Sequence, residues 1–170
     1  MTGGGGIEAT LEHYLRVAFR TDEDGRRAVS LAAANVHAPV QRALAELGPV
    51  TTWTEEDIAD VSCVYEVDGP GPEGATVFIS TVLPYAAVIL SQDRRYLRFA
   101  SAEETGWPKS VVRCLTDCGF FVLPEGACRA KRPEPPWPDG PLPSYFEALF
   151  EDEFGPPEDW SWMGEPDPAE

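Results

Sequence analysis

The chain has 170 residues with a hydrophobic content of 43%, which predicts one domain with a single core. Its formal net charge of −16 would repel the phosphates of nucleic acids and anionic membrane surfaces, so we expect neither as a partner. The longest apolar stretch, TVLPYAAVIL, is too short to span a membrane, and no basic start precedes an apolar run as in a signal peptide, so we expect a cytoplasmic protein.

The N-terminal part of the sequence predicts helices. Residues 1–6 include a run of glycines, and we expect a flexible start there. Apolar residues recur at helical spacing in residues 7–20, which predicts an amphipathic helix. The following helical composition is interrupted by Pro39, which lacks a backbone donor, so we expect two helical pieces, 26–36 and 39–47.

The middle of the sequence predicts strands. Apolar residues alternate in part of the segment 57–67, and residues 75–84 are rich in β-branched and aromatic side chains. The polar stretch SQDRR lies between two apolar runs, so a tight turn should join strands 86–92 and 95–100 in a hairpin. Strands that follow one another in this way predict an antiparallel meander.

The order of elements predicts the fold class. Residues 101–119 have an acidic start that would complement a helix dipole, an apolar stripe and a terminal glycine, so they predict another helix. Residues 120–124 predict a last strand or an extended segment packed on the core, and a helical turn or two at 144–150 follows. We therefore expect an α+β domain over residues 7–150, with an antiparallel sheet of about four to five strands and helices mainly on one face.

The C-terminal tail, residues 151–170, is acidic and contains aromatic residues. Nine acidic residues and no basic one occur from Ser144 to Glu170, and Trp160 and Trp162 would face the same way in an extended chain. Two interpretations stay open: the aromatic side chains pack on the core, or the tail contacts a basic partner. The second interpretation predicts partner contacts from Glu151, Asp152, Glu153, Glu158, Asp159, Trp160 and Trp162.

No pattern in the sequence predicts a catalytic centre. Cys114 and Cys118 are four residues apart on a predicted helix and could share a metal ion, but we interpret them as small core side chains. The other candidate ligands lack paired spacing: Cys63, Cys128, His13 and His37. Neither histidine has a Cys-His or Ser-His signature around it, and the carboxylate pairs lie in polar segments. We therefore expect no catalytic residue, no metal site, no cofactor and four reduced cysteines.

The succession of LAELGPV, VLPYAAVILSQDRRYLRF, CLTDCGFFVLPE and SYFEALF resembles the small immunity proteins of bacterial polymorphic toxin systems, over residues 40–150. The resemblance implies a non-enzymatic inhibitor that binds a cognate toxin, often over its active site, and it carries over no catalytic residues. We expect a monomer or weak dimer whose toxin partner has a basic surface. The alternative is a small cytosolic enzyme whose active site is assembled from distant segments.

Overall fold

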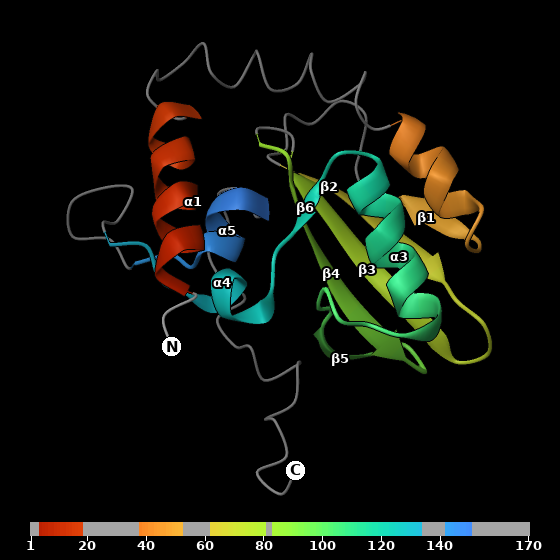
Figure 1. Ribbon diagram of the computed structural model, residues 1–170. Helices are drawn as coiled ribbons and strands as arrows, with labels where there is room; N and C mark the ends of the chain where they lie inside the picture. The colour runs from red at the N-terminus through yellow and green to blue at the C-terminus, as the bar shows by residue number, and fades with distance from the viewer. Residues whose placement is uncertain (1–3, 19–37, 53–61, 81–82, 134–141, 151–170) are drawn as a thin grey trace, which may run out of the picture.

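The computed structural model describes five stretches of the chain, residues 4–18, 38–52, 62–80, 83–133 and 142–150. They form helices and a six-stranded sheet, which confirms the α+β class (Figure 1). No helix in these stretches is long and apolar enough to cross a membrane.

The sheet is a meander with one addition. Its first five strands pair antiparallel in chain order: β1 (Val50–Thr52), β2 (Ser62–Asp68), β3 (Glu73–Ser80), β4 (Tyr85–Gln92) and β5 (Arg95–Phe99). The sequence predicted this arrangement except for β1, which has three residues and too few side chains for a period to show. The sixth strand, β6 (Phe121–Val122), pairs with β4 in parallel, so the sheet is mixed.

One edge of the sheet is built from two short strands placed end to end. β5 pairs with residues 89–92 of β4, and β6 pairs with Tyr85 and Ala86 at its start. The register of β5 shifts by one residue between Leu90 and Ser91. β4 is therefore covered along its outer side by two segments that are distant from each other in sequence.

The first face of the sheet is covered by two helices. Residues 38–45 are helical, as the sequence around Pro39 predicted, and α3 (Gly106–Asp117) lies beside them. Val111 and Leu115 are one turn apart and fully buried, because the apolar stripe of α3 faces the sheet. They share a core with β2, β3 and β4. The other expected helix, 26–36, lies outside the described residues.

The opposite face carries the remaining helices, α1 (Gly4–Ala18), α4 (Glu125–Arg129) and α5 (Tyr145–Phe150) (Figure 1). The expectation that helices gather mainly on one face is therefore wrong. The reason lies in β4, where all residues from Tyr85 to Leu90 are buried, so that both of its faces need a cover.

The N-terminal helix also begins earlier than the glycine run suggested. α1 starts at Gly4, inside the segment expected to be flexible, and Leu11 of α1 is fully buried. This helix contacts α4 and joins the core formed with α5. Burial of its apolar side offsets the low helix propensity of the glycines.

Candidate functional site

Large apolar side chains are exposed on the sheet edge formed by β5 and β6. Four large hydrophobic residues are exposed in the described stretches, and three of them, Tyr96, Leu97 and Phe121, lie on these two strands. Tyr96 lies opposite Ser91, and Phe121 lies opposite Tyr85 at the other end of β4. The edge therefore has two apolar positions, about 20 Å apart along the strand.

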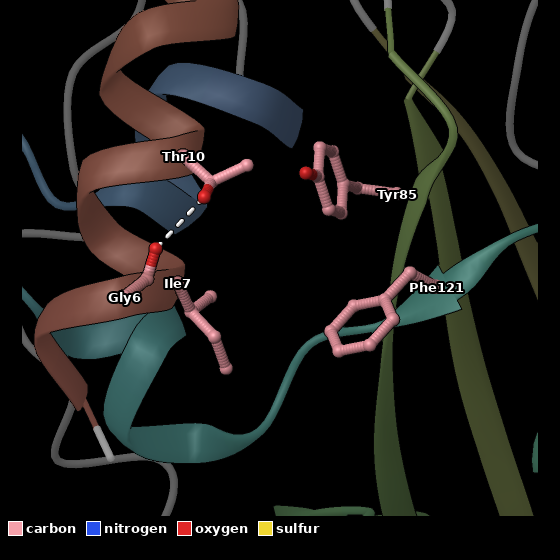
Figure 2. Close-up of a pocket in the computed structure, with 5 residues that line it drawn as sticks. All are labelled: Gly6, Ile7, Thr10, Tyr85 and Phe121. Atoms are coloured by element: carbon pink, nitrogen blue, oxygen red, sulfur yellow. Dashed lines mark hydrogen bonds between the residues drawn. The ribbon is translucent and has the colours of Figure 1, made fainter.

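The first position is a pocket of about 350 Å³ between α1 and the start of β4 and β6, which we call the edge pocket. It is lined by Gly6, Ile7, Thr10, Tyr85 and Phe121. Figure 2 shows Tyr85 and Phe121 pointing from the sheet edge toward Ile7 and Thr10 on the helix. The two rings meet edge to face, with centroids 6.1 Å apart, and Phe121 is 49% exposed.

The lining of the edge pocket suits binding. Among the described residues that line it, the only titratable group is the Tyr85 phenol, so these five hold no carboxylate, thiol or imidazole. The Thr10 hydroxyl donates its hydrogen bond to the Gly6 carbonyl within α1, at 2.8 Å, so its proton is already used and is not offered to the pocket. An apolar side chain from another molecule could cover Phe121 there and remove its ring from water.

The helical wall of the edge pocket is anchored by a polar network. Arg132 donates from Nε and Nη2 to the Glu12 carboxylate of α1, at 3.0 and 2.9 Å. The Tyr145 hydroxyl donates to the same carboxylate at 3.3 Å, and burial together with the Glu12 charge raises the pKa of Tyr145. No local pattern in the sequence predicts this contact, because Glu12 lies 120 residues from Arg132. The network fixes α1 against the C-terminal part of the fold.

The second apolar position, Tyr96 and Leu97, lies just after the turn between β4 and β5 and directly follows two arginines. We call Arg94, Arg95, Tyr96 and Leu97 together the hairpin tip. All four residues are exposed. The turn has two residues, Asp93 and Arg94, with φ of 49° and 62°. Positive φ at both positions is the type I′ geometry that suits the twist of a hairpin.

An ion pair holds the base of β5. Arg98 donates from both Nη atoms to the Glu104 carboxylate, with the Nη2 bond at 2.9 Å, and the backbone N–H of Ser101 donates to Glu104 at 2.9 Å. These bonds lower the pKa of Glu104, the Arg98 bond most. Glu104 was expected to complement the dipole of the following helix, but that helix starts at Gly106 and has no acidic residue in its first turn.

The cysteine pair is part of the core, as the sequence predicted. Cys114 and Cys118 are partly buried against the cluster that holds Val111 and Leu115. Burial and the neighbouring Cys118 raise the pKa of Cys114 to about 11, which keeps it a neutral thiol. All four cysteines are described, and none forms a disulfide. Within the described stretches no group of three or more His, Cys, Asp and Glu side chains could hold a metal ion.

The other residues singled out from the sequence are not brought together. His13 is exposed on α1, and His37 lies outside the described residues. The seven predicted partner contacts from Glu151 to Trp162 also lie outside them, as do the carboxylate pairs. The sequence did not identify Phe121 or Ile7, because a pocket between a helix and a strand far along the chain leaves no local pattern.

Charge is unevenly distributed along the chain. The described stretches hold 12 of the 29 acidic residues and 10 of the 13 basic ones, so they carry a net charge of −2. The remaining 17 acidic and 3 basic residues give −14. The described stretches are thus close to neutral.

No protein-family model matches the chain, and neither a curated protein nor a solved structure does. The resemblance to immunity proteins stays an interpretation of the sequence.

Proposed function

We propose that this chain is a non-enzymatic binding protein of the bacterial cytoplasm, an immunity factor that neutralises a cognate toxin by covering its active or substrate-binding surface. The observation that carries the proposal is the edge pocket, an open apolar site in which Phe121 is half exposed beside Tyr85. Its lining suits the capture of an apolar side chain, and aromatic residues are enriched in protein interfaces.

A toxin would have to cover more than the pocket. A stable protein interface buries about 1,200 to 2,000 Å² in total, so the partner would extend from the edge pocket over neighbouring surface. Removing the Phe121 ring from water would supply the short-range energy. The acidic tail, residues 151–170, would steer a toxin with a basic surface, because opposite charges accelerate association.

Two substitutions test the pocket in opposite ways. Phe121→Ala removes the exposed ring, and Gly6→Leu adds a large apolar side chain to the helical wall of the pocket, where a Cβ added to Gly6 would meet nothing within 4 Å. Gly126→Leu is the matched control, since Gly126 is also exposed on a helix with open space around it and does not line the pocket.

The measurement is calorimetric titration of each variant with the product of a toxin gene found next to the gene of this chain. We expect Phe121→Ala to weaken binding about thirtyfold and Gly6→Leu about tenfold, while Gly126→Leu binds as the unmodified protein does. Circular dichroism and melting temperature show that each variant is folded. Unchanged affinity of both folded pocket variants would exclude the edge pocket as the toxin site.

A further inference from the structure

The hairpin tip is basic and apolar on a chain that is acidic overall. Arg94 and Arg95 are exposed, and neither has a carboxylate within 4.0 Å among the described residues. The two residues that follow, Tyr96 and Leu97, are 40% and 48% exposed. Arginine and tyrosine are among the side chains most enriched in protein interfaces.

The turn keeps an arginine where the backbone favours glycine. Arg94 has a φ of 62°, in the left-handed region where a side chain crowds the carbonyl oxygen, and type I′ turns favour glycine at this second position. Because a non-glycine side chain at a positive φ costs stability, the exposed Arg94 side chain is a candidate for a role other than stability.

The hairpin tip is also held in place before any partner arrives. The backbone N–H of Asp93 donates to the Pro72 carbonyl at 2.9 Å, and Gln92 lies opposite Glu73 in the sheet. At the other end of β5, Arg98 is bound by Glu104. A preorganised surface loses little conformational entropy on binding, which favours affinity.

We propose that the hairpin tip docks on a carboxylate-rich surface of a protein partner. Arginine forks bind carboxylates through paired hydrogen bonds, and Leu97 would supply apolar contact beside them. The proposal rests on the binding function above, but it concerns a second surface at the far end of β4 and partner chemistry opposite to that expected for the acidic tail.

The charge distribution favours a protein over a nucleic acid. Residues 83–133 contain 8 basic and 5 acidic residues, whereas the rest of the chain contains 5 basic and 24 acidic ones. A nucleic acid has uniform negative charge, so it would be repelled by the rest of this chain. A protein surface can confine its carboxylates to one patch and meet the hairpin tip alone.

The test uses the full chain, labelled with ¹⁵N, and short poly-L-glutamate as a carboxylate probe at low salt, with an oligothymidylate of equal charge as the phosphate probe. We expect poly-L-glutamate to shift the backbone and arginine side-chain signals of the hairpin tip. The double variant Arg94→Glu/Arg95→Glu should weaken this binding about tenfold, since it reverses the local charge.

Two further variants separate local contact from total charge. Arg42→Glu/Lys109→Glu makes the same change in net charge on exposed helical positions and should bind as the unmodified chain does. Arg94→Gly removes the strain of the turn together with one arginine. It should therefore stabilise the fold and yet weaken the binding of poly-L-glutamate about threefold.

Each contrary outcome overturns the proposal in a distinct way. Equal losses in the two double variants would show that only net charge matters. Stronger shifts with oligothymidylate at the same residues would assign the surface to nucleic acid. Hairpin signals that move with sodium chloride in the unliganded chain, with no response to poly-L-glutamate, would mean that acidic residues of this chain already occupy the tip. Loss of toxin binding in Phe121→Ala tests the edge pocket separately.

Discussion

Trp107 and Gly69 allow a sharp test of how α3 is attached to the sheet. Trp107 lies at the start of α3, and its Nε1 donates to the Leu47 carbonyl at 3.1 Å. A Cβ added to Gly69 would lie 2.8 Å from Cε3 of the indole ring and 2.9 Å from Cδ2 and Cε2. The ring therefore lies against the glycine backbone, and we expect Gly69→Ala to destabilise the fold.

The size of the effect follows from these distances. Ordinary contacts of a Cβ begin at 3.4 Å, so the indole ring must move away by about 0.5 Å. A movement of that size would stretch the 3.1 Å hydrogen bond from Trp107 to the Leu47 carbonyl to about the longest distance at which such a bond still forms. Overpacking of this kind costs about 1 to 3 kcal/mol, and loss of a hydrogen bond costs about 1 kcal/mol. We expect Gly69→Ala to lower the free energy of unfolding by about 2 to 3 kcal/mol.

The assay is urea unfolding of a double-mutant cycle, Gly69→Ala with and without Trp107→Ala. Once the ring is removed, the alanine has room, so its cost should fall below about 0.5 kcal/mol and the coupling should be at least about 1.5 kcal/mol. Gly126→Ala is the control: nothing lies within 4 Å of its added Cβ, and because Gly126 is helical it should cost nothing and stabilise by at most about 1 kcal/mol. The same penalty in both backgrounds, or none in either, would refute the assigned contact.

Three further predictions concern charge and backbone strain. Arg94→Gly should raise the free energy of unfolding by about 1 kcal/mol, because glycine adopts its positive φ without strain; urea unfolding checks this, and lower stability would contradict it. The hydrogen bond from Arg98 lowers the pKa of Glu104 in the folded protein. The ionised carboxylate therefore stabilises the fold at pH values above the pKa of a glutamate in the unfolded chain, about 4.3. This stabilisation is lost as the pH falls through the lowered pKa of the folded state. Melting temperatures measured from neutral to acidic pH should therefore fall less steeply below about pH 4 in Glu104→Gln, and an equally steep fall would count against this role. Glu12→Gln should cost about 3 kcal/mol by leaving the partly buried Arg132 charge without its counterion, and a change below about 0.5 kcal/mol in thermal unfolding would exclude a stabilising pair.

Local patterns predicted most of the elements. The stripe of Val111 and Leu115 and the polar turn at Asp93 act over a few residues, so the sequence alone located α3 and the β4–β5 hairpin. α4 was missed because five residues are too few for a helical period to show.

Long-range pairing could not be predicted in this way. The Phe121 strand was expected from its apolar run, but its parallel partner at Tyr85 depends on how a distant segment returns to the sheet. The helices on both faces follow from the burial of both sides of β4, which one apolar run does not specify. The edge pocket and the Glu12 network join segments separated by more than a hundred residues and were therefore invisible in the sequence.

The attachment of α1 has a consequence for synthesis. Glu12 bonds to Tyr145, 133 residues later, and buried Leu11 belongs to a cluster made largely of residues from β4 onward. At about 5 to 20 residues per second, a ribosome needs roughly 7 to 27 seconds to add the partners of α1 after the helix itself. During that time the first helix has no completed core to join, and its contacts have a large sequence separation, which slows folding. The edge pocket, whose helical wall is α1, therefore forms only after α5 has been made.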